Sequence, residues 1–189
     1  MTAEQKKTQR PAVFALLIGI KLLIVCAVVA ALISGVNALT DQKYQDNIEA
    51  EKAKALSRIF APDQVEQGQQ LRDGVSEVVK DGNVIGYCVE VTNREGFGGD
   101  VNMMVGFSTD GTVIGVSIVS HSETPGVGSK VVNNAGYLSE NYKGKNGILE
   151  LGSDVDASAG ATVSSSAVLN GVNKATELLN SVVDLGGAA

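Results

Sequence analysis

Residues 156–166 combine small and hydroxyl-bearing residues at the start of the last predicted helix. Thr162 falls where the first backbone N–H groups of that helix lack an intrahelical acceptor and where the helix dipole is positive. A helix start of this kind binds anions such as phosphate, and the hydroxyls of Ser164, Ser165 and Ser166 would add donors. Taken alone, the segment favours the alternative of an ordinary helix start rich in capping residues.

Two other segments carry glycine where a backbone turns or approaches a flat group. Residues 96–100 contain Gly98 and Gly99, and glycine lets a backbone come close to a planar ring or take a positive φ. Residues 121–130 follow an apolar run and contain Thr124-Pro125-Gly126, which is typical of a turn with a preset shape. Each segment alone is explained by a bulge or a turn.

Together, and in their order along the chain, the three segments resemble the FMN-binding domain family. Asp156–Thr162 resembles the family's Asp-x-x-Ser/Thr-Gly-Ala-Thr, residues 121–128 resemble His-x-Glu-Thr-Pro-Gly-Leu-Gly, and Gly96–Gly99 resembles Gly-Tyr-Gly-Gly. Ala159 departs from the pattern, because the family usually has Ser or Thr there. The departure removes one hydrogen bond near the phosphate.

The resemblance implies that FMN is joined to Thr162 by a phosphoester bond, and that a separate flavin transferase makes this bond. It also implies that the other segments line the flavin, although they are distant in sequence. The cofactor-binding residues predicted with Thr162 are Gly98, Gly99, Glu123, Thr124, Gly126, Gly128, Ser129, Gly160, Ala161, Ser164 and Ser165. No catalytic or metal-binding residue is predicted. For His121 an orienting hydrogen bond is favoured over acid–base chemistry, and for Asp156 capping or orienting the loop is favoured over metal binding.

Within this family the chain resembles the G subunits of the Rnf complexes, ahead of the C subunits of sodium-pumping NADH:quinone reductases. The resemblance implies an electron-transfer subunit of a complex that moves electrons between ferredoxin and NAD, coupled to Na⁺ or H⁺ transport. The partners implied are the other membrane and peripheral subunits. The rival function is a membrane-anchored extracytoplasmic binding or sensor domain without a redox role, which would be colourless.

The charge is distributed unevenly along the 189 residues. Residues 1–40 carry four basic side chains and one acidic one, so the remainder carries eleven basic and twenty acidic side chains. An acidic domain without Trp argues against nucleic acid as a partner. Cys26 and Cys88 are interpreted as small buried hydrophobes that form no disulfide or metal site.

Residues 12–39 are predicted to be a transmembrane anchor, because the apolar run exceeds the apolar region of a cleaved signal peptide, the alternative. Lys21 would cost about 3 kcal/mol at mid-bilayer, so the span is expected to cross from Leu22 with the Lys21 amine at the interface. Residues 1–11 are expected to be cytoplasmic and the C-terminal domain extracytoplasmic, although Lys43 and later basic residues dilute the charge signal.

The remaining chain is predicted to have an α+β fold, with a twisted antiparallel sheet packed with helices. A helical connector at residues 40–70 precedes the FMN-binding domain at 71–189. Asp81-Gly82 predicts a hairpin between strands at 75–79 and 84–92, and 108–111 predicts a second hairpin. Ile85, Tyr87, Val89 and Val91 are expected to share one face of their strand. Apolar residues at helical spacing predict a helix at 163–181 that packs on the sheet.

Overall fold

The computed structural model describes residues 11–61 and 64–183. The chain divides into two units, residues 1–47 and 48–189, and each unit is described separately. The predicted cytoplasmic N-terminus lies outside the described residues, apart from Pro11.

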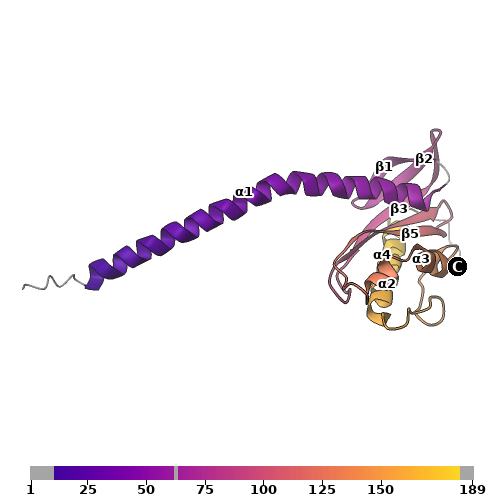
Figure 1. Cartoon of the computed structure of the whole chain (residues 1–189). Helices are drawn as coiled ribbons and strands as arrows, with labels where there is room; N and C mark the ends of the chain where they lie inside the picture. The colour runs from indigo at the N-terminus through magenta and orange to yellow at the C-terminus, as the bar shows by residue number, and fades with distance from the viewer. Residues whose placement is uncertain (1–10, 62–63, 184–189) are drawn as a thin grey trace, which may run out of the picture. The chain divides into compact units, whose positions relative to one another are not determined.

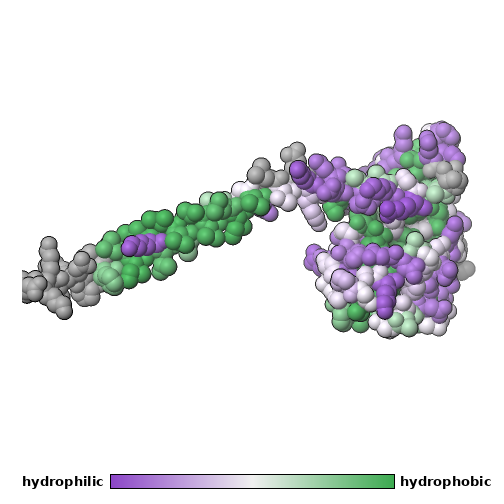
Figure 2. Space-filling model, viewed as in Figure 1, coloured by the Kyte–Doolittle hydropathy of each residue, from purple (hydrophilic) through white to green (hydrophobic). Residues whose placement is uncertain are grey.

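The first unit is formed by helix α1, which begins at Pro11 and ends at Ile59 in the second unit (Figure 1). Phe14–Asn37 is long and apolar enough to cross a membrane, with a mean hydropathy of 3.0 and none of its surface buried. Its 24 residues would extend about 36 Å, which exceeds a hydrocarbon core of about 30 Å. On the face that Figure 2 shows, this segment is covered by apolar side chains apart from one hydrophilic group.

The second unit is built on a five-stranded antiparallel sheet with the order β1-β2-β3-β4-β5. The strands are β1 (Glu66–Arg72), β2 (Val75–Lys80), β3 (Asn83–Asn93), β4 (Val101–Ser108) and β5 (Val113–His121). Each strand pairs with its neighbour in the chain. Asp81 and Gly82 both have positive φ between the paired residues Lys80 and Asn83, which is the geometry of a two-residue hairpin turn. The predicted α+β fold and both hairpins are confirmed.

Strand β1 is not predicted by the sequence pattern, and neither are the short helices at Ser129–Val132 and Ala135–Tyr142. Strand β1 occupies part of the range 40–70, for which a helical connector is expected, whereas helix α1 already ends at Ile59. The pattern of β1 is polar, Glu-Gln-Gly-Gln-Gln-Leu-Arg, and its side chains are mostly exposed. Such a strand lacks the apolar alternation on which a sequence prediction depends.

Helices cover both faces of the sheet. Three helices follow the strands, α2 (Ser129–Val132), α3 (Ala135–Tyr142) and α4 (Thr162–Asn180). The apolar side of α4 packs on one face, as predicted, in a core that contains Val168, Leu169, Val172, Ala175 and Leu179 of the helix and Val75, Val89, Val91, Val101, Met103, Val105 and Phe107 of the strands. The opposite face packs against Ala55, Leu56, Ile59 and Phe60.

The side chains of β3 alternate between the two cores except at one position. Tyr87, Val89 and Val91 pack on the α4 side, as expected, but Ile85 packs in the opposite core. The register of β3 against β2 shifts between Gly86 and Val84, so Ile85 is the extra residue of a β-bulge. A bulge reverses the alternation of side chains, which explains why the prediction for Ile85 is wrong.

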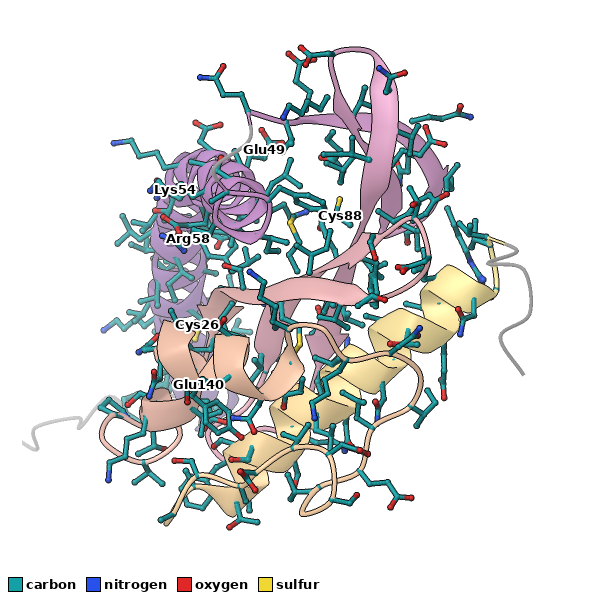
Figure 3. All side chains as sticks on the ribbon, turned by 90° about the vertical axis from the view of Figure 1, so that its right-hand side faces the viewer. Cys26, Glu49, Lys54, Arg58, Cys88 and Glu140 are labelled. Atoms are coloured by element: carbon teal, nitrogen blue, oxygen red, sulfur yellow. The ribbon has the colours of Figure 1, made fainter. Side chains whose placement is uncertain are left out.

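The side chain of Cys88, on β3, lies in the core between the end of α1 and the sheet (Figure 3). Burial raises the pKa of its thiol to about 11, so it stays protonated at neutral pH. Cys88 is therefore a small buried hydrophobe, as predicted. Cys26 differs from the prediction, because it is exposed on α1 within the apolar segment and not buried by the protein.

Glycines on neighbouring strands make room for the end of α1. Gly106 of β4 pairs with Gly115 of β5. A Cβ at Gly106 would overlap the side chain of Ile59 and come within 3.0 Å of the Phe60 ring. A Cβ at Gly115 would make only an ordinary contact with Ile59, at 3.6 Å. The close fit of helix and sheet therefore depends on Gly106.

Replacing Gly106 with alanine is expected to destabilise the second unit by about 1–3 kcal/mol, because overpacking displaces Ile59 and Phe60. The melting temperature of the purified chain should fall by several degrees. Gly115→Ala is the matched control on the paired strand and should change it by much less. Equal melting temperatures for the two variants would contradict this account of the packing.

Candidate functional site

The strand register brings the loops of the candidate site to one edge of the sheet. Asn93 at the end of β3 pairs with Val101 at the start of β4, and Val101 pairs with His121 at the end of β5. The loop 94–100 and the segment after His121 therefore leave the sheet side by side. The buried Asn93 Nδ2 donates to the carbonyl oxygen of Ala167 in α4 over 2.7 Å, which ties this edge of the sheet to the first turns of the helix.

Thr162 is the first residue of α4 and is exposed. Ala161 precedes it in a non-helical conformation and provides no side-chain cap. The helical ladder starts with the Ser165 N–H donating to the Ala161 carbonyl at 2.9 Å, so the N–H groups of Thr162, Val163 and Ser164 precede the first intrahelical bond. This helix start has the free donors and the positive dipole that an anion requires.

The loop before Thr162 is held by hydrogen bonds that its backbone N–H groups donate. The Ser158 N–H donates to Ser165 Oγ at 3.0 Å, and the Ala161 N–H donates to the Ser158 carbonyl at 3.0 Å. Gly160 has a φ of 74°, a left-handed conformation that favours glycine. Ser165 is fully buried, so its hydroxyl faces the loop and not the solvent.

Asp156 is fixed through its backbone. Its N–H donates to Asn141 Oδ1 and its carbonyl accepts from Tyr137 Oη, both at 2.7 Å. Burial is the main cause that raises the pKa of the Tyr137 hydroxyl, which keeps this donor protonated at neutral pH. The Asp156 carboxylate is exposed. The sequence analysis misses Tyr137 and Asn141, because no motif connects helix α3 to this loop.

The Glu123 carboxylate is the centre of the site. Its side chain is 5% exposed. Oε1 accepts from the N–H of Phe97 at 3.1 Å, and Oε2 accepts from the N–H of Gly98 at 3.0 Å. A buried carboxylate requires such donors, since an unpaired buried charge is costly. Glu123 thus binds the glycine-rich loop, residues 96–100, to the segment that follows β5.

Glycines allow the surrounding backbones to come into contact. A Cβ at Gly98 would overlap the Ser122 carbonyl and come within 2.7 Å of the Thr124 nitrogen. A Cβ at Gly128 would overlap the Glu123 carboxylate and come within 2.5 Å of Ser164 Oγ. The structure therefore brings Gly98, Glu123, Gly128 and Ser164 together from the three segments.

The hydroxyl of Ser164 is buried without a partner. Its residue is 0% exposed, and its Oγ makes no hydrogen bond with any residue that the structure describes. An unsatisfied buried hydroxyl is uncommon in native proteins. This one lies beneath the helix start, next to Gly128 and opposite the Glu123 carboxylate.

The hydrogen bonds of Thr124, Gly126 and Ser129 lie within their own turn. The Ser129 N–H donates to the Thr124 carbonyl at 3.4 Å, and Ser129 Oγ accepts from the Gly126 N–H at 2.8 Å. Gly126 and Gly99 have φ values of 78° and 131°. No hydrogen bond connects these four residues to α4 in residues 64–183. Their contact with a flavin stays a prediction.

His121 orients the segment that carries Glu123. Its Nδ1 accepts from the Glu123 N–H at 3.2 Å, so its Nε2 carries the proton and donates to Asn133 Oδ1 at 3.1 Å. This arrangement agrees with the orienting role favoured for His121. The described residues contain no group of three or more His, Cys, Asp or Glu side chains that is suited to a metal ion.

The structure also places exposed apolar side chains at this site. Phe97 is 59% exposed and Val163 is 51% exposed. Neither was predicted as a site residue. An aromatic residue between glycines at 96–99 is the signal in the sequence that indicates Phe97.

Replacing Glu123 with glutamine is expected to destabilise the domain by about 1.5–3 kcal/mol, because one backbone donor of the glycine-rich loop loses its charged acceptor. Amide hydrogen exchange at Phe97 and Gly98 should accelerate. Asp100→Asn, the same change at an exposed position of the same loop, is the control and should change neither stability nor exchange. Unchanged exchange in Glu123→Gln would contradict the clamping role of the carboxylate.

Comparison with known proteins first defines the class of this site. Residues 96–177 match the FMN-binding domain family. This range contains the glycine-rich loop, Glu123 and the start of α4.

The similar proteins extend beyond this domain. The chain is 30% identical over 142 residues to the G subunit of the Na⁺-translocating ferredoxin:NAD⁺ oxidoreductase complex of Acetobacterium woodii, covering 70% of this chain and 67% of that protein. It is 28% identical over 177 residues to the G subunit of the ion-translocating oxidoreductase complex of Methanosarcina acetivorans, covering 85% and 94%. The corresponding G protein of Haemophilus influenzae (strain PittEE) is 28% identical over 168 residues, covering 78% and 80%. The chain belongs to this family of G subunits.

Proposed function

We propose that this chain is a membrane-bound, electron-carrying flavoprotein subunit of an ion-translocating ferredoxin:NAD oxidoreductase complex. The observation that carries the proposal is the contact between the α4 start and two glycine-rich segments through Glu123 and Gly128. Family membership supports the same function.

The residues at this site fit FMN. Free N–H groups at the start of α4 and the exposed Thr162 hydroxyl suit the phosphate. The tight backbone contacts of Gly98 and Gly128 suit a rigid wall for the ring. FMN would supply the redox chemistry by accepting and donating electrons, while the protein binds and orients it. No general base is required for that role.

In this proposal FMN is attached covalently at Thr162 by a phosphoester bond to its Oγ. Thr162 is exposed at the first position of α4, so an enzyme can reach its hydroxyl. Its Oγ makes no hydrogen bond with the residues described here that would activate it, which supports attachment by a separate flavin transferase. The Ser164 hydroxyl, turned inward and fully buried, is not accessible in the same way.

Thr162→Ala is expected to abolish flavin attachment. The intact mass of the unaltered chain, produced together with the flavin transferase, should exceed its sequence mass by one FMN less a water, roughly 438 Da for a phosphoester. Ser166→Ala removes a half-buried hydroxyl one turn later and should keep this increment. Full flavinylation of Thr162→Ala would show that another residue carries the flavin. A binding or sensor domain without a redox role would show no increment in any variant.

The proposed topology places the N-terminus in the cytoplasm and the domain outside it. The basic residues Lys6, Lys7 and Arg10 precede the apolar segment, and cytoplasmic flanks are enriched in such residues. Covalent attachment suits this location, because a cytoplasmic pool of free FMN cannot hold the cofactor there by mass action. The proposed partners are the other membrane and peripheral subunits of the complex.

A C-terminal reporter that is active only after export is expected to be active on this chain. The reason is that Phe14–Asn37 is the one helix among the described residues that is long and apolar enough to cross a membrane, and that basic residues precede it. The matched control is a reporter that is active only in the cytoplasm, fused at the same point. Activity of that control, with an inactive export reporter, would reverse the proposed topology.

A further inference from the structure

Exposed large apolar side chains are few in the second unit. Among the described residues from 48 to 183, they are Val84, Phe97, Ile148 and Val163. Phe97 and Val163 belong to the candidate site, whereas the other two are remote from it. Val84 lies near the start of β3, at the end of the strand opposite the site. Ile148 is next to Leu149, and the Leu149 N–H donates to Asn173, which lies three turns along α4 from Thr162.

Phe97 is also the most exposed aromatic residue of this unit. Phe60, Phe107 and Tyr142 are buried, and Tyr87 and Tyr137 are half-buried. The exposure of Phe97 is 59%. A chain with only four Phe, four Tyr and no Trp therefore presents one of its few aromatic rings to solvent from the loop that Glu123 holds.

The backbone beneath Phe97 is held firmly. Its N–H donates to the buried Glu123 carboxylate, and a Cβ at Gly96 would come within 2.9 Å of Glu123 Oε1. Gly98 packs directly on Ser122 and Thr124. Because the loop backbone is already ordered, keeping the Phe97 ring exposed costs little further conformational entropy. In a mobile loop, the hydrophobic effect would favour packing of the same ring against the protein surface.

Contacts connect the Phe97 backbone to the first turn of α4. Glu123 contacts the Phe97 N–H on one side and, across Gly128, approaches Ser164 on the other. Val163 lies between Ser164 and Thr162 in the first turn of α4 and is 51% exposed. The two exposed apolar side chains thus belong to two segments that Glu123 and Gly128 bring together.

We infer that Phe97 is a flavin-positioning residue that stacks on the isoalloxazine ring, with Val163 as a second apolar contact. The inference rests on the proposed function, because it requires FMN at the start of α4. A flat aromatic ring system on a tether needs an apolar partner to stay oriented, and an exposed phenyl ring provides one through stacking. Phe97 sets the position of the ring and not its attachment, which belongs to Thr162.

The test uses the full-length chain, flavinylated in cells with its transferase and purified in detergent, with loading measured by intact mass. Phe97→Trp and Ile148→Trp form a matched pair, because an indole stacked on a flavin quenches its fluorescence and a distant indole does not. Per loaded flavin, Phe97→Trp should lower the fluorescence at least about twofold. Ile148→Trp should leave it unchanged.

A second pair of variants tests the native ring. Phe97→Ala should raise the iodide quenching constant of the flavin by about twofold or more and weaken its visible circular dichroism, because the ring loses its apolar partner. Phe97→Tyr should restore both signals, and Ile148→Ala should change neither. Far-UV circular dichroism verifies that the variants are folded.

The possible outcomes separate this inference from the proposed function. An unaltered chain without the FMN mass would overturn both. Normal loading with unchanged fluorescence, iodide access and circular dichroism in the Phe97 variants would overturn the stacking inference alone. If those variants then fail to assemble with the other subunits, Phe97 belongs to a protein docking surface instead.

Discussion

The buried carboxylate of Glu123 is the interaction on which the candidate site depends. A carboxylate at 5% exposure is stable only when donors surround it, and here those donors are backbone N–H groups of a loop about 25 residues earlier in the chain. Without Glu123 the glycine-rich loop would lose the bonds from Phe97 and Gly98 that hold it to the segment after β5. Without Gly128 the carboxylate has no room beside α4. One ionised side chain thus assembles three separate segments.

The sheet determines where this assembly forms. Because β3, β4 and β5 are consecutive antiparallel strands, the end of β3, the start of β4 and the end of β5 lie in register at Asn93, Val101 and His121. The bond from Asn93 to α4 then fixes the helix against the same edge. Strand register therefore places segments that are distant in sequence near one another, and the Glu123 carboxylate then holds their loops together.

Sequence patterns predicted the elements with strong periodicity and the turns with special chemistry. Asp81-Gly82 predicted its hairpin because few residues accept two consecutive positive φ values, and the apolar spacing of Val168 to Leu179 predicted the buried side of α4. The motifs singled out three segments, and the structure brings these segments together. The motifs did not predict that Glu123 faces inward to hold Phe97 and Gly98, because that role depends on tertiary contact. Strand β1 and the bulge at Ile85 were missed for the same reason, since no local pattern encodes them.

The polar edge strand β1 affects how readily the sheet pairs with neighbouring chains. An open sheet edge offers unpaired N–H and C=O groups to any neighbouring chain, and long regular edges of this kind nucleate aggregation. Strand β1 is rich in glutamine and charged residues, and its register shifts twice against β2. An irregular, hydrophilic border of this kind is a poor template for further strand pairing, and it lets the sheet remain soluble beside its neighbours.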